Sequence, residues 1–396
     1  VLTHLKLRAS YGKVGNDKLG NERFLYLTNI STGSGFVSSL GRGQAINMGK
    51  LGNENLTWEV AYKQNYGVDL KLFNDFSFSF DYFKEKREDI LIVRGTVPEL
   101  QGVAIGNLPK VNMGVVNNQG FEIETGYQKR LDSGLFFSIK GNFAYNKNEQ
   151  RNMDEAILSK DYAYRYRKTG YSIGQQFGYL IDYSNGNGYI NTAEELEEAK
   201  RMYKIGTPRL GDFKYQDVNG DGEINEKDQA PIKYTDVPRI TYGLTGAVEW
   251  KGVDFSFHFS GIGKASRLYN SWGATELGNE GIYTDVHMHA WTPERYANGE
   301  KIEYPALASI ANTNHIANDY FIMDRSFLRL KNIELGYTLP KSLLQKVGLS
   351  KVRVYINGNN LITWKKIKTN TIDPEQSWEV NYPLTKMVNF GVNVVF

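Results

Sequence analysis

The segment 217–228, DVNGDGEINEKD, has the residue order of a calcium-binding loop of the EF-hand type. A hard cation takes six to eight oxygen ligands at about 2.3–2.6 Å, and alternate positions of a tight loop can deliver them. Gly222 stands where such a loop turns sharply, and Ile224 is expected to anchor the loop to apolar neighbours. The predicted ligands are the side chains of Asp217, Asn219, Asp221 and Asp228 and the backbone carbonyl of Glu223.

The surroundings of this loop favour a structural cation over a calcium sensor. A helix with its N-cap at Thr192 and a capping box to Glu195 is predicted before the loop. After the loop, Pro231 follows too soon for the second long helix that a sensor needs. Asp228 is one methylene shorter than the usual Glu, so both Ca²⁺ and Mg²⁺ are candidate ions. A sensor, or a loop without a tightly bound metal, are the alternatives.

Histidine and aromatic side chains in other segments are candidate ligand contacts. If residues 285–291 are extended, His287 and His289 lie on the same side of the segment, close to Asp285. These three side chains could ligate zinc or copper. An ordinary loop contact is the more common role of such a histidine pair. Exposed aromatic rings stack on sugars, but they also pack loops together. The predicted substrate contacts are Trp272, Tyr283 and Trp291, and Tyr183 and Trp378 are further candidates.

The overall composition excludes several classes of protein. The charge balance of 47 basic against 44 acidic residues, a net +3, gives no sign of a nucleic-acid partner. The chain has no Cys and only five scattered His, so we predict that it is not an enzyme. The sequence contains no run of about 18 apolar residues and therefore predicts no membrane-spanning helix. The 26 Tyr, 20 Phe and 40 Gly suit many long strands joined by tight turns.

Alternation with a period of two residues is the dominant pattern in the chain. In residues 57–73 one face carries Trp58, Val60 and Tyr62, whereas the other carries Lys63 and Asp69. A strand of about 17 residues would be on the order of 55 Å long, far beyond the usual five or six residues. Charged side chains on the second face, such as Glu122, are expected to line a wet interior and to form salt bridges.

The alternation predicts about ten antiparallel strands. Near Lys331–Asn332 the apolar positions change parity, which predicts a β-bulge. The predicted strands cover residues 3–13, 56–73, 76–92, 114–130, 134–150, 238–251, 253–266, 323–339, 351–364 and 385–396.

The connections between these strands alternate in length. The short ones are predicted at 74–75, 131–134, 251–252 and just after Pro340. The long ones cover 14–55, 93–113, 151–237, 267–322 and 365–384. Short turns at one end and long loops at the other are typical of a transmembrane up-and-down β-barrel, whose apolar face meets lipid. We therefore predict an all-β fold in which the chain forms a segment of a transmembrane β-barrel. The cation loop would lie in an extracellular insertion at 151–237.

Several motifs in order along the chain resemble one family. They are LGNENLTWE at 51–59, NNQGFEIE at 117–124, DVNGDGEIN at 217–225, PRITYGL at 238–244, the segment 324–364 and the closing VNFGVNVVF at 388–396. These segments are similar to the C-terminal barrel part of the SusC/RagA family of TonB-dependent outer-membrane transporters. The resemblance covers most of the chain.

The resemblance implies a 22-stranded barrel of which residues 1–396 form the last ten strands, in a Gram-negative outer membrane. It also implies a plug domain and TonB contact in a region absent from this chain, and a SusD-like surface lipoprotein as partner. The implied function is TonB-dependent import of a glycan or peptide nutrient. Phe396 resembles the terminal aromatic residue of the outer-membrane assembly signal. The alternative from another class is a soluble or surface-anchored β-rich glycan-binding protein stabilised by calcium.

Overall fold

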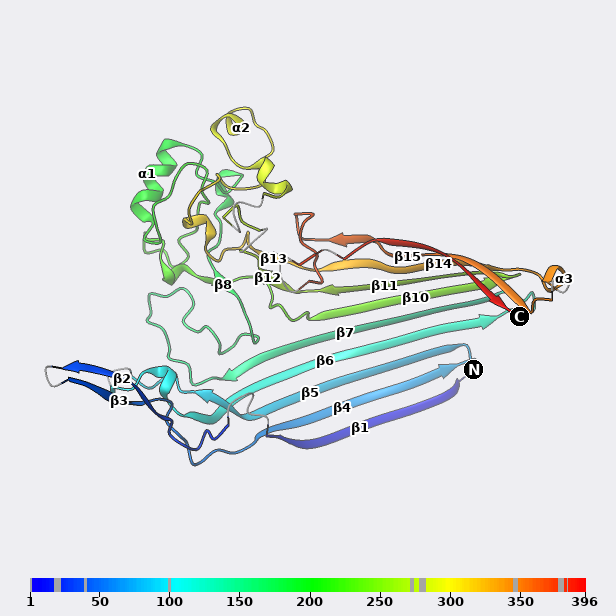
Figure 1. Cartoon of the computed structure of the whole chain (residues 1–396), viewed down its shortest axis with the longest axis horizontal. Helices are drawn as coiled ribbons and strands as arrows, with labels where there is room; N and C mark the ends of the chain where they lie inside the picture. Colours follow the sequence, from blue (N-terminus) through cyan, green and yellow to red (C-terminus); the bar gives the residue numbers. More distant parts are fainter. Residues whose placement is uncertain are drawn as a thin grey trace.

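A computed structural model describes residues 2–17, 23–38, 41–98, 101–270, 274–277, 283–344, 348–376, 381–382 and 384–396. Its main feature is one ten-stranded sheet whose strands are neighbours in chain order, each pair antiparallel (Figure 1). The strands are β1 (Leu2–Asn16), β4 (Glu59–Leu72), β5 (Phe76–Val93), β6 (Lys110–Arg130), β7 (Phe136–Asn152), β10 (Ile240–Trp250), β11 (Val253–Gly263), β14 (Phe327–Thr338), β15 (Lys351–Lys365) and β16 (Met387–Val395). Each predicted strand has a counterpart, so the predicted up-and-down architecture is confirmed.

Short and long connections lie at opposite ends of the sheet, as predicted (Figure 1). Between β10 and β11, Lys251 and Gly252 have φ angles of 47° and 86° and form the whole turn. Two adjacent left-handed residues match the right-handed twist of the strands on either side. At this same end β1 begins and β16 ends, since Leu2 pairs with Leu72 and Val395 pairs with Lys351.

The predicted bulge lies at Lys331. The register of β14 skips this residue against both of its neighbours, because Leu330 pairs with Phe259 and Ile362 while Asn332 pairs with His258 and Asn359. An extra residue in one strand restores apolar side chains to one face after the parity change.

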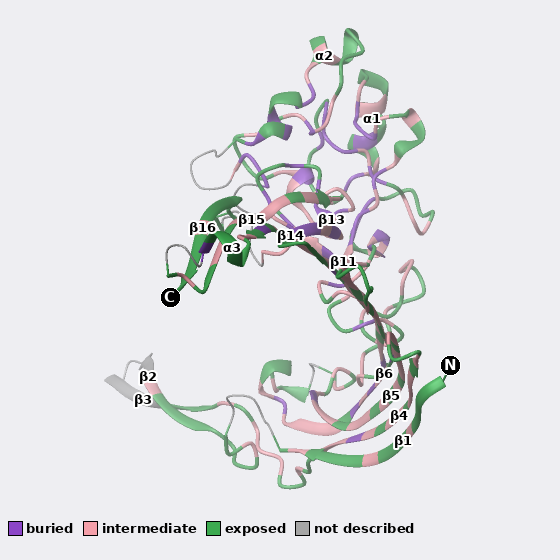
Figure 2. Ribbon diagram, turned by 90° about the vertical axis from the view of Figure 1, so that its right-hand side faces the viewer, coloured by how far each residue is buried: buried purple, intermediate pink, exposed green. Residues whose placement is uncertain are grey.

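The two faces of the sheet differ in chemistry. On one face, the rings of Phe80, Phe121 and Phe143 form a row across three strands, with centroids 6.2 and 5.9 Å apart. Among the described residues no second layer covers this face, and Leu7 and Phe390 are 76% and 81% exposed. Viewed along the strands, the sheet is a single arc (Figure 2). A two-layered soluble fold would bury such a face, so its exposure favours contact with lipid.

The long connections after β7 and β11 pack together into one folded body, here called the loop body, at the end opposite the tight turns (Figure 1). Its core includes Ile190, Phe213, Ile224, Tyr304 and Phe321, each at most 2% exposed. Its elements are β8 (Phe177–Gly178), η3 (Tyr183–Asn185), α1 (Ala193–Met202), η4 (Glu226–Asp228), β9 (Ala230–Pro231), β12 (Ser266–Leu268), η5 (Asp285–His289), α2 (Pro293–Ala297), η6 (Thr313–His315) and β13 (Ile322–Asp324). The remaining elements are β2 (Ile30–Ser38), β3 (Gly41–Met48), η2 (Ile105–Asn107) and α3 (Lys341–Leu344).

The predicted helix before the cation loop is α1, and its capping differs in one detail. Thr192 accepts a hydrogen bond from the Glu195 backbone N–H, as expected. The Glu195 carboxylate instead accepts from the N–H of Asn191, one residue before the N-cap. This contact still satisfies a donor at the entry to the helix. Within the described ranges, the helices are all too short or too polar to span a bilayer.

Candidate functional site

The first half of the 217–228 loop is a tight turn built around Asp217. Its Oδ1 accepts hydrogen bonds from the N–H groups of Gly220 and Asp221 at 2.7 and 3.2 Å, and its Oδ2 accepts from Gly222 at 2.8 Å. Asn219 donates to the Asp221 carboxylate at 2.8 Å. Three predicted ligands are thus held within one turn.

Asp228 closes the loop from its buried side. Its carboxylate is 0% exposed, accepts from the N–H groups of Val218 and Asn225 at 2.8 and 2.9 Å, and has its pKa raised by burial. Ile224 lies in the core, and its backbone pairs with Met202 at the end of α1. The predicted anchoring role of Ile224 is confirmed.

Calcium binding by the loop stays a prediction. Across the described ranges, no three His, Asp or Glu side chains gather in a cation-binding arrangement. The carboxylates of Asp217 and Asp228 are turned onto backbone N–H groups, and the Glu223 side chain lies 3.7 Å from Lys204. Carboxylate and amide oxygens are nevertheless the ligands that calcium prefers. The loop suits the ion in residue type and spacing, and its carboxylates must reorient to bind it.

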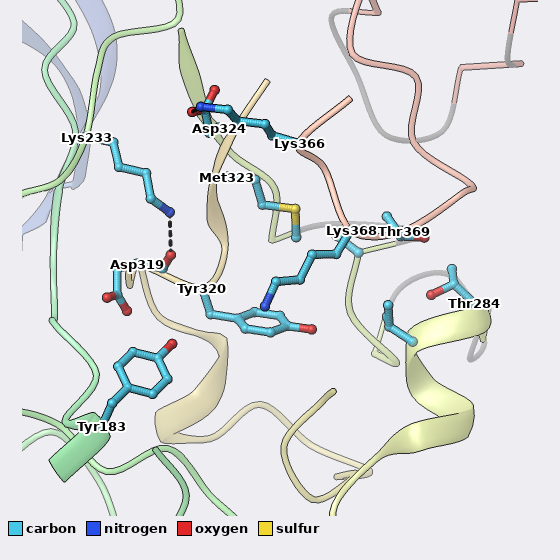
Figure 3. Close-up of a pocket in the computed structure, with 12 residues that line it drawn as sticks. Tyr183, Lys233, Thr284, Asp319, Tyr320, Met323, Asp324, Lys366, Lys368 and Thr369 are labelled. Carbon is cyan, nitrogen blue, oxygen red and sulfur yellow. Dashed lines mark hydrogen bonds and ion pairs between the residues drawn. The ribbon is translucent and has the colours of Figure 1, made fainter. Parts of the chain in front are cut away.

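A cavity of about 450 Å³ lies where the loop body meets the long-loop ends of β14 and β15 (Figure 3). Its walls come from segments far apart in the sequence, which the packing of the long connections brings together. The lining residues are Tyr183, Lys233, Ala274, Thr284, Val286, Asp319, Tyr320, Met323, Asp324, Lys366, Lys368 and Thr369.

Three lysines of this cavity have different partners. Lys366 pairs with Asp324 at 3.1 Å. Lys233 donates to the backbone carbonyls of Asp319 and Ile322 at 2.8 and 2.7 Å, and burial lowers its pKa. Lys368 lies over the ring of Tyr320, 5.7 Å from its centroid. No motif in the sequence marks these lysines as site residues, and their one local signal is the run KKIK at 365–368.

The predicted aromatic contacts have different outcomes. Tyr283 is 63% exposed and precedes Thr284, which lines the cavity. Tyr183 lines the cavity directly and is 53% exposed. Trp291 is only 5% exposed, and its indole N–H donates to Asn191 at 3.0 Å. It is therefore a core side chain and not the exposed stacking surface that we expected. The last two candidates, Trp272 and Trp378, lie outside the described residues.

The histidine segment is not extended as the metal hypothesis assumed. It forms the 3₁₀ helix η5, in which buried His287 accepts from the Thr284 N–H at 2.8 Å. The His287 ring contacts the edge of Tyr304 with centroids 4.3 Å apart. These contacts give His287 a packing role.

Beside η5, Glu276 is a buried carboxylate with several donors. Its oxygens accept from the Tyr304 hydroxyl at 2.6 Å and the Ala308 N–H at 2.9 Å, and His315 Nε2 lies 3.1 Å away. Burial alone would raise its pKa, but His315 and Tyr304 lower it from 4.5 to about 2. The ionised form is thus stabilised by folding.

We expect the loop body to lose stability in acid through Glu276. Because its folded-state pKa is depressed, its contribution is complete above about pH 4.5 and disappears as the pH falls towards 2. The substitution Glu276→Gln should lower the melting temperature at pH 7 and flatten the pH dependence in this window. Circular dichroism melts between pH 2 and 7 test this, and an equally steep pH dependence in the variant would contradict it. Exposed Glu294→Gln is the control.

Charged side chains on the second face of the sheet form ion pairs. Arg8 bridges Asp69 and Asp81 at 2.9 and 2.7 Å, and Lys63 lies 3.7 Å from Glu85. The expectation of a polar, salt-bridged face is confirmed for Lys63 and Asp69.

Comparisons with known proteins agree with this architecture. The family model described as TonB dependent receptor-like, beta-barrel matches residues 1–361. The chain is 27% identical to TonB-dependent receptor P26 of Formosa agariphila over 99% of this chain and 40% of the relative. It is 23% identical to TonB-dependent receptor SusC of Bacteroides thetaiotaomicron over 100% of this chain and 38% of the relative. The chain thus spans about two fifths of the length of these relatives.

Among solved structures, the RagAB peptide transporter superposes with a TM-score of 0.69 at 22% identity, over 100% of this chain and 41% of that one. The "open-open" state of the RagAB peptide importer gives a TM-score of 0.67 at the same identity. This likeness confirms the barrel fold. TonB-dependent receptors are outer-membrane transport proteins and not enzymes. From the match over residues 1–361 and the ten-stranded meander, the chain belongs to the TonB-dependent receptor β-barrel family.

Proposed function

We propose that the intact protein imports a nutrient, a glycan fragment or an oligopeptide, across the outer membrane. TonB supplies the energy through a plug region outside this chain, and a SusD-like surface lipoprotein delivers the cargo. The observation that carries this proposal is the single sheet with an open apolar face and with its long connections gathered into the loop body. RagAB, which shares the fold, is a peptide importer.

A closed barrel is part of this proposal. In the described part of the chain, β1 pairs only with β4, and β16 pairs only with β15. Unpaired backbone groups in hydrocarbon cost several kcal/mol each, so a membrane sheet must close on itself. Further strands of the intact protein would therefore pair with the outer edges of β1 and β16, giving 22 strands as the resemblance implies.

Uptake by whole cells tests the import proposal. Cells carrying the intact protein are supplied with labelled glycan and peptide mixtures, in the presence and absence of TonB and of the partner lipoprotein. We expect accumulation of one cargo class that stops without TonB and falls strongly without the lipoprotein. Uptake that is unchanged by deletion of the receptor gene or of TonB would contradict the proposal.

We also propose that the 217–228 loop binds Ca²⁺ and stiffens the loop body. Its support is the ligand spacing, the turn around Asp217 and the anchoring of Ile224 in the core. An ion that binds only the folded loop at 100 times its dissociation constant adds about 2.7 kcal/mol.

We therefore expect Ca²⁺ to raise the melting temperature of the loop body relative to a chelator, and Mg²⁺ to do so less. Asp217→Ala should abolish the gain, because it removes both a ligand and the centre of the turn. Asp132→Ala, in a tight turn at the other end of the sheet, is the matched control. Equal melting temperatures with Ca²⁺ and with chelator would show that the loop is closed by its own hydrogen bonds alone.

A further inference from the structure

The cavity under the loop body has the size and composition of a ligand site. Its volume of about 450 Å³ lies in the range of ligand pockets, roughly 300–1,000 Å³. Figure 3 shows Lys233 and Lys368 entering from opposite sides, with the rings of Tyr183 and Tyr320 below them. Such sites combine apolar walls with a few polar groups that fix orientation.

The charges in the cavity are not balanced by direct contacts. Among the described residues, Lys366 is the only one of the three lysines that pairs with a carboxylate, that of Asp324. Lys233 spends two of its three N–H donors on backbone carbonyls, which are neutral. Within the part of the chain that the structure describes, the Lys368 ammonium has neither a hydrogen bond nor an ion pair, only the face of Tyr320. Donors are therefore available on Lys368, and one more on Lys233.

The second acid of the cavity, Asp319, acts on Lys233 and Lys368 through space but forms an ion pair with neither. Its carboxylate accepts the Ile181 N–H at 3.2 Å, and burial raises its pKa. No described carboxylate contacts either Lys233 or Lys368. The site is therefore prepared for an anionic group brought by a ligand, because charge-assisted hydrogen bonds in a partly enclosed site are the strong ones.

We infer that this cavity binds an acidic ligand through a carboxylate held by Lys368 and Lys233, with the body of the ligand lying on Tyr320 and Tyr183. The inference rests on the proposed import function, for which it names the chemical class of the cargo. A uronic-acid sugar and an acidic peptide both carry this group, so both are used as probes.

Titration calorimetry on the intact, detergent-purified protein tests the inference with two matched ligand pairs. The first pair is digalacturonate and its methyl ester, and the second is the dipeptide Gly-Glu with an amidated C-terminus and the corresponding Gly-Gln amide. We expect the acid of at least one pair to bind at least tenfold more tightly than its neutral counterpart. The pair that discriminates identifies the source of the carboxylate.

Variants test the assigned residues. Lys368→Met should weaken binding of the acid by roughly 10- to 100-fold, the range for one hydrogen bond to a charged group. It should leave binding of the neutral counterpart unchanged, and Lys368→Arg should retain most of the affinity. Exposed Lys200→Met on α1 is the control. Equal binding of acid and neutral ligand, no binding of either acid, or wild-type affinity in Lys368→Met would overturn the inference.

Binding and uptake separate this inference from the import proposal. If TonB-dependent uptake persists for a neutral cargo while neither acid binds, the inference fails and the import proposal stands. If the acids bind as expected but no uptake depends on TonB, the import proposal fails and the site remains.

Discussion

Replacing Arg329 with methionine is expected to lower the free energy of unfolding by about 3–5 kcal/mol, the cost of removing one partner from a buried ion pair. The Arg329 side chain on β14 is 2% exposed and contacts Asp373 at 2.7 Å and also Glu375. Lys331, at the bulge, contacts Glu375 at 2.6 Å. Without Arg329, two carboxylates would face each other with a single cation.

The same change should detach the segment that follows β15. Residues 373–375 are held against β14 by these ion pairs, so we expect proteolysis near them to accelerate in Arg329→Met. Arg151→Met on β7 is the matched control. The Arg151 side chain, which pairs with Glu149, is 55% exposed, so we expect its loss to change the free energy of unfolding by less than about 1 kcal/mol. Urea unfolding of the intact protein in lipid vesicles measures both variants. Equal midpoints would show that the Arg329 cluster does not hold this segment.

The substitution Leu244→Arg is expected to cost about 2–4 kcal/mol, the range for a charge on the lipid face near the middle of a membrane barrel. Leu244 lies midway along β10 on the apolar face, beside Phe259 of β11, and is 39% exposed. A charged side chain there would have to leave water for hydrocarbon.

The neighbouring residue supplies the control for this prediction. Thr245 points to the opposite, polar face, where its hydroxyl lies 2.9 Å from His258 Nδ1. Thr245→Arg should therefore change stability much less than Leu244→Arg, although the added group is the same. The reverse order, with Thr245→Arg the more harmful, would mean that the polar and apolar faces are misassigned.

Local patterns were enough to predict the sheet. Alternation with a period of two is set by the backbone itself, so it located all ten strands, and the parity change at Lys331 located the bulge. The alternation of short and long connections then predicted that consecutive strands pair in chain order, as they do in the sheet. The helix α1 was also predictable, because Thr192 and the apolar positions around Ala199 are local signals.

The candidate site was much less predictable, because it depends on packing between distant segments. Lys233, Asp319 and Lys368 follow three different strands, and no spacing in the sequence relates them. Trp291 was predicted as a ligand contact from its type and its loop, but its burial depends on how Gly211 and Asn191 close over it. The metal alternative for the histidine pair assumed an extended segment, but η5 turns this segment, in agreement with the ordinary loop contact that we favoured.

Spin-label accessibility along β10 tests most directly whether this sheet separates lipid from water. Residues 1–396 contain no cysteine, and each residue from Ile240 to Trp250 is replaced in turn by a labelled cysteine in a cysteine-free background of the intact protein in lipid vesicles. The account predicts that even-numbered positions are accessible to oxygen dissolved in lipid and odd-numbered positions to a water-soluble nickel complex. Equal accessibility at both parities, or even-numbered positions shielded from both reagents, would contradict it.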